Sequence, residues 1–273
     1  MAAYGRDLSD FQSYFESLDE GLSWSTVDAD VVRGWMEHMM DKGNSASSIC
    51  RRLSALRSFY RYALARDLVT SNPAHSVESP KKHKPLPQFV KEREMDEVLE
   101  PEMWGDNFKD VRARTLLLTF YSTGIRLSEL IGLDDHMVDF TTGELRVTGK
   151  RDKQRIIPFG EELREELQEY IRCRDASVAR QCAALFVTDK GERMNRNKVR
   201  YEVQKALARV TTLKKRSPHV LRHTFATAML NHDAGLESVK KLLGHESLST
   251  TEIYTHATFE QLKRVYNNAH PRA

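Results

Sequence analysis

Apolar side chains recur at helical spacing through much of this chain. The clearest case is the segment 45–69, which reads SASSICRRLSALRSFYRYALARDLV. Five of its apolar residues fall on one face of a helix: Ile49, Leu53, Leu56, Tyr60 and Ala63. Residues 111–124 and 198–210 are also helical in pattern. We therefore expect a mainly α-helical protein.

Two stretches depart from the helical pattern and predict a small β-sheet. Residues 144–159 hold two short apolar runs around a polar turn at 149–153, which is typical of an antiparallel hairpin. Residues 184–188, ALFVT, form a further short apolar run that could be a third strand. The expected fold class is mainly α, with a small antiparallel β-sheet in one part of the chain.

Proline marks the best domain boundary. Half of the eight prolines lie between residues 71 and 89, and proline blocks the propagation of both helix and sheet. A chain of 273 residues also suggests two domains at about 150 residues each. We expect a helical N-terminal domain over residues 1–78, a linker over 79–91 and a second domain over 92–273.

The charge of the chain permits a polyanionic partner without requiring one. The net charge is +3 and the isoelectric point about 8.7, so a nucleic-acid surface has to come from clustered Lys and Arg side chains. The linker supplies one such cluster in Lys81, Lys82 and Lys84. An extended basic segment can follow a phosphate backbone, although a solvated linker has the same composition.

The helix predicted over 45–69 supplies a second basic cluster. Arg51 and Arg61 lie opposite its apolar face with serines between them, and small hydroxyl residues permit close approach to DNA. Arg52 and Arg57 extend this set of candidate DNA contacts. A solvated charged face is the alternative reading of the same pattern.

Other features narrow the class of protein. The three cysteines are scattered without a CxxC pair, which argues against a disulfide framework and a cysteine zinc site. No apolar run approaches the ~18 residues of a membrane span, and Arg6, Asp7 and Asp10 interrupt the N-terminal segment. We expect a cytoplasmic protein.

A phosphate site is predicted at the start of one helix. In SPHVLRHTFATAML, residues 217–230, Ser217 suits the N-cap and Pro218 the first helical position. His219 and Arg222 then share a face near the positive end of the helix. A metal site built on His219 and His223 is disfavoured, because zinc-protease helices have a glutamate where this chain has Val220.

Three further segments carry candidate chemistry. Arg126 follows a Thr-Gly turn and opens a helix predicted to run through Leu127, Leu130 and Leu133, with Glu129 placed to form an ion pair with it. A surface arginine is the alternative. Lys150 lies at the tip of the predicted hairpin, where it is either a solubilising residue or a proton donor to a leaving oxygen. Tyr254, flanked by His245 and His256, is either a packed aromatic or a reactive hydroxyl.

Together these segments resemble the tyrosine recombinase, or phage integrase, family. The resemblance rests on TGIRLSEL, SPHVLRHTFAT, LLGHESLSTTEIYTH and the terminal HPRA, with AYGRDL, LRSFYRYAL and NPA in the first third of the chain. It covers nearly the whole sequence and is greatest for the bacterial Xer recombinases. It implies an N-terminal core-binding domain of the SAM-like type and a catalytic domain with a small sheet.

The resemblance also implies a mechanism. Tyr254 would attack a DNA phosphodiester and form a 3′-phosphotyrosine link. Arg126 and Arg222 would bind the nonbridging oxygens, and His219 would accept the tyrosine proton or bind the phosphate. His245 would hydrogen-bond a nonbridging oxygen, and Lys150 would protonate the leaving 5′-oxygen. The resemblance implies neither a metal ion nor another cofactor.

Partners are implied in the same way. We expect double-stranded DNA with an inverted-repeat-like site, a homotetramer or a heterotetramer with a paralogue on that DNA, and a septal DNA translocase. Resolution of chromosome or plasmid dimers at a dif-like site is the expected role. An integrase of a mobile element and a DNA-binding regulator with an inactive site are the alternatives.

The last helix has two possible locations. Phe259, Leu262 and Val265 predict an apolar face within residues 257–270. That face could pack within its own domain or, as the resemblance implies, on a neighbouring protomer. We expect the second arrangement, in which deletion of residues 258–273 abolishes synapsis and leaves binding to a single site intact.

Overall fold

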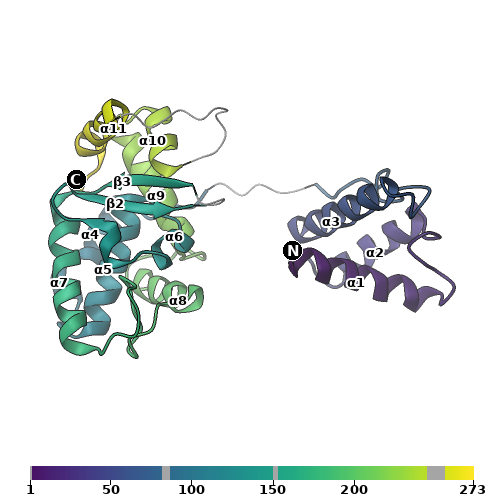
Figure 1. Cartoon of the computed structure of the whole chain (residues 1–273), viewed down its shortest axis with the longest axis horizontal. Helices are drawn as coiled ribbons and strands as arrows, with labels where there is room; N and C mark the ends of the chain where they lie inside the picture. Colours follow the sequence, from purple (N-terminus) through teal and green to yellow (C-terminus); the bar gives the residue numbers. More distant parts are fainter. Residues whose placement is uncertain (1, 82–86, 150–152, 245–255) are drawn as a thin grey trace. The chain divides into compact units, whose positions relative to one another are not determined.

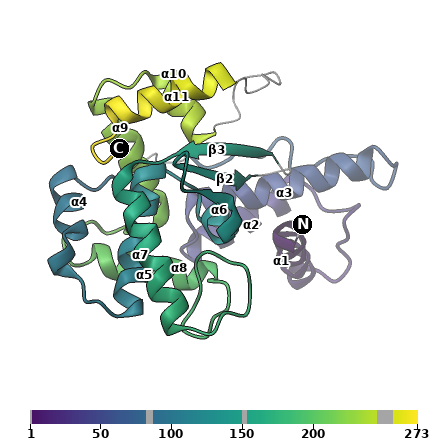
Figure 2. The ribbon, with the colours of Figure 1, turned by 60° about the vertical axis from the view of Figure 1, so that its left-hand side comes forward.

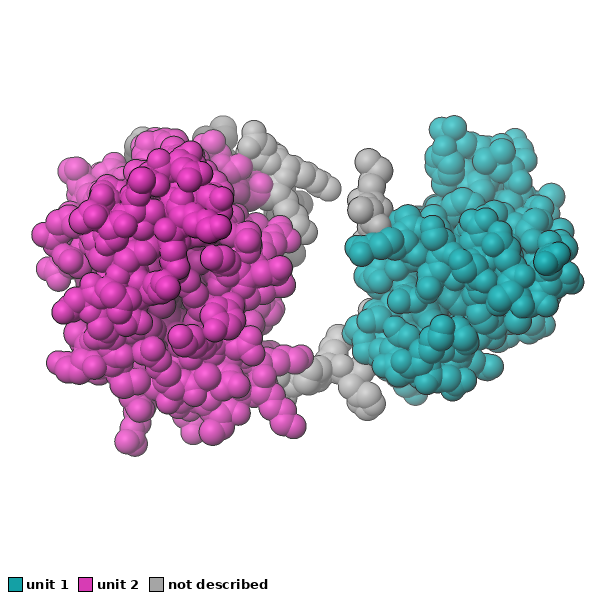
Figure 3. Space-filling view, turned by 90° about the horizontal axis from the view of Figure 1, so that it is seen from below, with its two compact units in different colours: residues 1–86 teal, residues 87–273 magenta. Residues whose placement is uncertain are grey.

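The computed structural model describes residues 2–81, 87–149, 153–244 and 256–273. The chain forms two compact units, residues 1–86 and 87–273, which Figure 3 colours separately. Within the described ranges, no helix has both the length and the apolar character needed to cross a membrane. The expected two-domain, mainly helical architecture is confirmed (Figure 1).

Residues 2–81 of the first unit form the helices α1 (Ala2–Leu18), α2 (Ala29–Asp41) and α3 (Ala46–Leu64). The side chain of Asp28 begins α2 by accepting hydrogen bonds from two backbone N–H groups of its first turn. Phe11, Phe15 and Trp35 meet α3 in a core of their own. All five residues of the predicted apolar face of α3 are buried there, which confirms that prediction.

The second unit begins with α4 (Glu92–Leu99), a 3₁₀ turn η1 (Pro101–Met103), α5 (Phe108–Thr123) and α6 (Leu127–Ile131). A second 3₁₀ turn, η2 (Asp135–Met137), leads into the strands β1 (Val138–Asp139), β2 (Glu144–Thr148) and β3 (Gln154–Pro158). The remaining helices are α7 (Glu161–Ser177), α8 (Arg196–Leu207), α9 (Pro218–Asn231), α10 (Leu236–Leu243) and α11 (His256–Ala269).

Helix α5 is the central element of the second unit. Every residue from Thr115 to Thr123 is buried, and α5 packs against α7, α8 and α9 (Figure 2). A helix that is buried all round in this way cannot show an amphipathic pattern in its sequence. It forms the fixed support from which the loop to α6 projects.

The sheet is antiparallel with the strand order β1-β2-β3, and the predicted hairpin over 144–159 is confirmed. The prediction of a third strand at 184–188 is wrong, because β1 takes that place. Ala184 and Val187 form only isolated bridges, to Asp134 and Arg193. Residues 184–187 are fully buried between separate loop segments, and a short apolar run does not reveal whether its neighbour is a strand or a loop.

Helix α11 packs within its own unit, against α9 and α10. Leu262, Tyr266 and Ala269 are buried in that contact, and Val265 is partly buried. This is the first of the two locations considered from the sequence. Docking on a neighbouring protomer remains a proposal.

Candidate active site

A sharp turn between α5 and α6 places the first arginine. Gly124 ends α5 in the left-handed conformation, with φ of +57°. A Cβ atom at this position would lie 2.5 Å from a ring carbon of Phe225, so both conformation and space favour glycine. The chain then reaches Arg126, the N-cap of α6. Helix α6 ends at Ile131 and is therefore shorter than predicted, with Leu133 buried just beyond it.

Arg126 is held by two different acceptors. Its Nη1 donates to Glu129 Oε1 at 2.8 Å, which confirms the expected ion pair, and its backbone N–H donates to Glu129 Oε2 at 2.8 Å. Its Nη2 donates to the backbone carbonyl of Gly244 at 2.6 Å. The side chain is still 36% exposed, so part of the guanidinium faces solvent.

Arg222 approaches from α9. That helix begins as predicted, with Ser217 as N-cap and Pro218 at the first helical position, although the Ser217 side chain makes no capping hydrogen bond. Arg222 is 8% exposed and donates to the carbonyl oxygens of Gly124 and Leu243, each at 2.6 Å. Burial, together with the positive charges of Arg126 and Arg155, lowers the pKa of Arg222 to about 10. The group is therefore still charged at neutral pH.

The end of α10 brings the two arginines together. The last carbonyls of a helix have no partner within the helix and form its negative end. Arg222 takes the carbonyl of Leu243 and Arg126 takes the carbonyl of the next residue, Gly244. Gly244 itself has φ of +66°, the usual conformation of a glycine that ends a helix. The two guanidinium groups are thus held side by side, because their acceptors are the carbonyls of consecutive residues.

A buried carboxylate connects these groups to the sheet. Glu129 is 3% exposed and accepts hydrogen bonds from both η nitrogens of Arg155 on β3, that from Nη2 at 3.0 Å. Burial alone would raise the pKa of Glu129, but the hydrogen bonds and charges of Arg155 and Arg126 hold it below its usual value. Three guanidiniums (Arg126, Arg155 and Arg222) and one carboxylate give the cluster a net charge of 3 − 1 = +2.

Arg155 is not among the site residues predicted from the sequence. A usable signal was present, because strand side chains alternate and residue 155 shares a face with the buried Ile157. A charged residue at an inward position of a strand needs a partner inside the protein. The predicted hairpin therefore indicated that Arg155 needs a buried partner, but it did not indicate that this partner is Glu129.

His219 has a partner on its own helix, His223. His219 and His223 are one helical turn apart on α9. Their Nε2 atoms lie 3.2 Å from each other, and their rings are nearly perpendicular. At this distance one ring donates and the other accepts, so the pair shares one proton. Burial lowers the pKa of His223, and the charges of His219 and Arg222 lower it further. His219 is exposed and faces solvent.

Three expected catalytic residues, Lys150, His245 and Tyr254, lie outside the described residues. Two of them directly follow glycines that the structure places beside the cluster. A Cβ atom on Gly149 would lie 3.5 Å from Glu129 Oε1, and Gly244 accepts the hydrogen bond from Arg126.

The candidate DNA contacts in the first unit lie in different settings. Arg51 and Arg52 form ion pairs with Asp7 and Asp10, respectively, while Arg61 is exposed. Arg57 holds the segment after α3, since its Nε donates to the carbonyl of Ala74 at 2.9 Å. Lys81 is exposed. Lys82 and Lys84 lie outside the described ranges. Contact of these seven residues with DNA stays a prediction.

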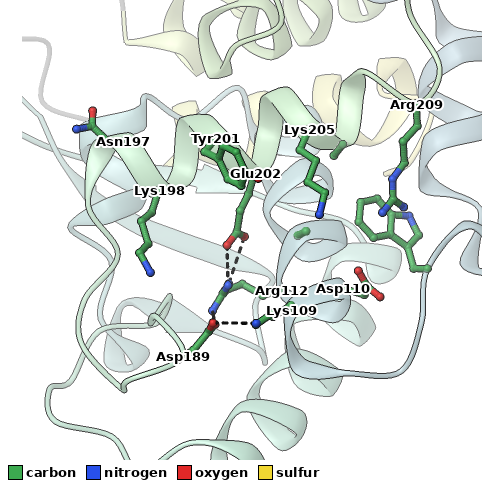
Figure 4. A pocket seen from close by; sticks show the side chains of 13 residues that line it. Lys109, Asp110, Arg112, Asp189, Asn197, Lys198, Tyr201, Glu202, Lys205 and Arg209 are labelled. Atoms are coloured by element: carbon green, nitrogen blue, oxygen red, sulfur yellow. Dashed lines mark hydrogen bonds and ion pairs between the residues drawn. The ribbon is translucent and has the colours of Figure 1, made fainter.

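Apart from the arginine cluster, a cleft of about 550 Å³ lies between α5 and α8 (Figure 4). Its buried arginine, Arg112, donates to Glu202 at 2.6 Å and to Asp189 at 2.8 Å, so two carboxylates offset its charge. This network joins α8 to α5 and leaves no buried cation free for a phosphate among the residues lining the cleft. Elsewhere in the described ranges, no group of three His, Cys, Asp or Glu side chains could hold a metal ion.

Comparison with known proteins decides the family. Residues 88–261 match the phage integrase family, and residues 1–67 match the SAM-like N-terminal domain of phage integrases. The chain is 40% identical to tyrosine recombinase XerC of Pelotomaculum thermopropionicum, over 99% of this chain and 92% of that protein. The chain is a tyrosine recombinase of the phage integrase family.

Other relatives place the recombinase among the Xer proteins. It is 38% identical to tyrosine recombinase XerC of Staphylococcus saprophyticus and 34% identical to tyrosine recombinase XerD of Oceanobacillus iheyensis, over its whole length and 91% and 92% of theirs. Its fold is similar to that of a XerH site-specific recombinase bound to a palindromic difH substrate, with a TM-score of 0.76 and 22% identity over 96% of this chain and 77% of that chain.

Proposed function

We propose that this recombinase cuts and rejoins duplex DNA through a 3′-phosphotyrosine intermediate formed by Tyr254. The phenol oxygen attacks the phosphorus, the bond from phosphorus to the 5′-oxygen breaks, and the phosphate remains bonded to the 3′-end and the enzyme. A 5′-hydroxyl from another strand then attacks the phosphotyrosine and releases the tyrosine. One bond to phosphorus forms as one breaks in each step, so no ATP is needed.

The paired arginines carry this proposal. Each guanidinium has five N–H groups and gives two of them to the acceptors described above, so three remain on each for phosphate oxygens. The cluster charge of +2 matches the charge of −2 on the five-coordinate phosphorus that forms as the tyrosine oxygen attacks, one negative charge more than the phosphodiester carries. A site held rigid before the reaction stabilises that charge without reorganising.

The remaining groups supply proton transfer. A free tyrosine has a pKa near 10 and needs a base at neutral pH. His219 is exposed on α9, three residues before Arg222, and its hydrogen bond to His223 can orient it as the acceptor of the tyrosine proton. We assign protonation of the leaving 5′-oxygen to Lys150 and a hydrogen bond to a nonbridging oxygen to His245.

We further propose that the substrate is a dif-like site and that the recombinase resolves chromosome or plasmid dimers. The curated relatives named XerC and XerD support this role over that of a mobile-element integrase. Assembly as a tetramer on DNA, with itself or a paralogue, and stimulation by a septal DNA translocase belong to the same proposal. The fold match to a recombinase solved with difH DNA supports DNA as the partner.

A nicked suicide substrate tests the chemistry. Loss of the short fragment beside the nick traps the covalent complex, which denaturing electrophoresis detects. The wild-type protein should form an adduct in the presence of EDTA, and Tyr254→Phe should form none while it still binds the DNA. An adduct on the Phe variant, or cleavage that stops when EDTA is added, would contradict the proposal. Absence of an adduct for wild type on a cognate site would favour an inactive DNA-binding regulator.

A further inference from the structure

Arg155 is a buried cation whose role the proposed mechanism leaves open. It lies on β3 opposite Val147, and its side chain is 9% exposed. A buried guanidinium is costly unless its hydrogen bonds are satisfied. Both of its η nitrogens donate to Glu129, so the pair has the parallel, two-bond geometry that arginine forms with carboxylates.

Arg155 also lies where three segments of the site meet. A Cβ atom on Gly244 would be 3.0 Å from Arg155 Cδ and 3.3 Å from Cζ, so the arginine packs against the end of α10. Its carboxylate partner, Glu129, lies beside Gly149 at the end of β2. Arg155 therefore connects the hairpin, the start of α6 and the end of α10.

The charge balance shows what Arg155 does for Arg126. Glu129 is shared by the two arginines, and Arg126 uses a single η nitrogen on it. Without Arg155, the full negative charge of Glu129 would act on Arg126 alone. The net charge of the cluster would fall from +2 to +1, and Arg126 would be drawn towards the carboxylate instead of a phosphate.

We propose that Arg155 is a positioning residue that neutralises Glu129, so that Arg126 keeps its charge and donor groups for the scissile phosphate. This inference rests on the proposed DNA cleavage. Arg155 is buried behind Glu129 and acts through it, without touching the substrate. The same contact holds the hairpin end and the end of α10 in register around Arg126.

The test compares Arg155→Met with Arg146→Met on two suicide substrates. Arg146 lies on the neighbouring strand but is exposed, which makes it a matched control. One substrate carries the normal scissile phosphate, and the other carries a methylphosphonate, which lacks one negative charge. The measured quantity is the rate of adduct formation relative to wild type on the same substrate.

Arg155→Met should slow adduct formation on the phosphate substrate by about a hundredfold, at the low end of losses seen when a charge-stabilising group is removed. On the methylphosphonate the loss should be less than tenfold, because less charge has to be stabilised. Arg146→Met should match wild type on both. A purely structural defect would slow both substrates equally, and that result would overturn the proposal, as would wild-type rates for Arg155→Met.

Two further variants keep the test decisive if Arg155→Met fails to fold. Glu129→Gln combined with Arg155→Met removes both members of the buried pair, so it should fold. Once Glu129 carries no charge, Arg155 has nothing to neutralise, and the double variant should form the adduct at a rate close to that of Glu129→Gln alone. Arg155→Lys keeps the charge but not the paired hydrogen bonds. It should lose less activity on the phosphate substrate than Arg155→Met. If Arg155→Met does not fold, the comparison is made with the double variant. A double variant much slower than Glu129→Gln alone, or a lysine variant no better, would count against the proposal. Failure of the wild-type protein to form an adduct would instead contradict the proposed function itself.

Discussion

At the scale of single residues, the site depends on backbone carbonyls that hold cationic side chains. Arg222 takes its acceptors from Gly124 and Leu243, and Arg126 takes one from Gly244. Two of these three acceptors belong to glycines in the left-handed conformation. The geometry of the arginines is therefore set by turns that few other residues can form.

Gly124→Ala should damage both folding and cleavage. The substitution places an L-residue at positive φ and a methyl group 2.5 Å from the ring of Phe225, which we expect to cost roughly 2–4 kcal/mol of unfolding free energy. It also moves a carbonyl that binds Arg222. Chemical denaturation of the whole chain gives the unfolding free energy of the second unit, and the suicide-substrate assay gives the rate of cleavage.

Gly235→Ala is the matched control for that prediction. Gly235 has φ of −58°, and a Cβ atom there meets nothing within 4 Å. Gly235 is the N-cap of α10, where glycine is preferred over alanine, so we expect a loss of at most about 1 kcal/mol and normal cleavage. If Gly124→Ala behaves like this control, the turn does not set the position of Arg222.

At the scale of elements, the chain end after α11 is fixed to the core by a neutral histidine. His270 Nε2 donates to the carbonyl of Tyr121 at 3.1 Å, and its Nδ1 accepts from the backbone N–H of Arg272 at 3.1 Å. Both ring nitrogens are used by the neutral form, and a second ring proton would displace the Arg272 N–H. Burial lowers the pKa of His270 to about 4, with Arg272 and His232 adding to the effect.

This lowered pKa predicts a pH dependence of stability. The unfolded chain binds the proton near pH 6.5 and the folded chain only near pH 4. The contribution of His270 to stability is therefore complete above pH 6.5 and decreases as the pH falls from 6.5 to 4. We expect a loss of about 2 kcal/mol from this group between pH 7.5 and pH 5. Urea unfolding of wild type and His270→Gln at both pH values measures the difference.

His270→Gln should lower stability at pH 7.5 yet show a weaker dependence on pH. His136→Gln, which replaces an exposed histidine of η2, should keep the dependence of wild type. Equal pH dependence in all three proteins would show that His270 does not titrate as its contacts indicate.

At the scale of the whole molecule, the two units have separate cores joined by the basic, proline-rich segment. Phe11, Trp35 and Leu53 belong to the first core, while Leu116 and Ile157 belong to the second. The connecting segment either contacts DNA phosphates or serves only as a solvated linker. Salt dependence of binding separates these possibilities.

The combined variant Lys81→Gln, Lys82→Gln and Lys84→Gln should weaken DNA binding and its salt dependence. Each lost phosphate contact lowers the slope of log K against log salt by about 0.9, so three contacts would lower it by about 2.7. Arg172→Gln, an exposed position on α7, serves as the control and should leave the slope unchanged. An unchanged slope for the triple variant would identify the segment as a solvated linker.

Much of this protein was determined by sequence pattern alone. The apolar face of α3, the β2–β3 hairpin, the start of α9 and the ion pair between Arg126 and Glu129 follow from local spacing, and the structure has each of them. Local pattern suffices there because the interacting groups lie within a few turns or one hairpin of each other. The order of the motifs was also enough to indicate the family.

Only the tertiary structure decided the contacts between distant segments. The third strand proved to be residues 138–139 instead of 184–188, because a fully buried apolar run fits either a strand or a loop in the core. The partnership of Arg155 with Glu129 and the anchoring of two arginines on the end of α10 join segments 21 to 118 residues apart. The periodicity of apolar residues does not predict such pairs, because the partner of a buried charge depends on which segments lie next to it in the folded structure.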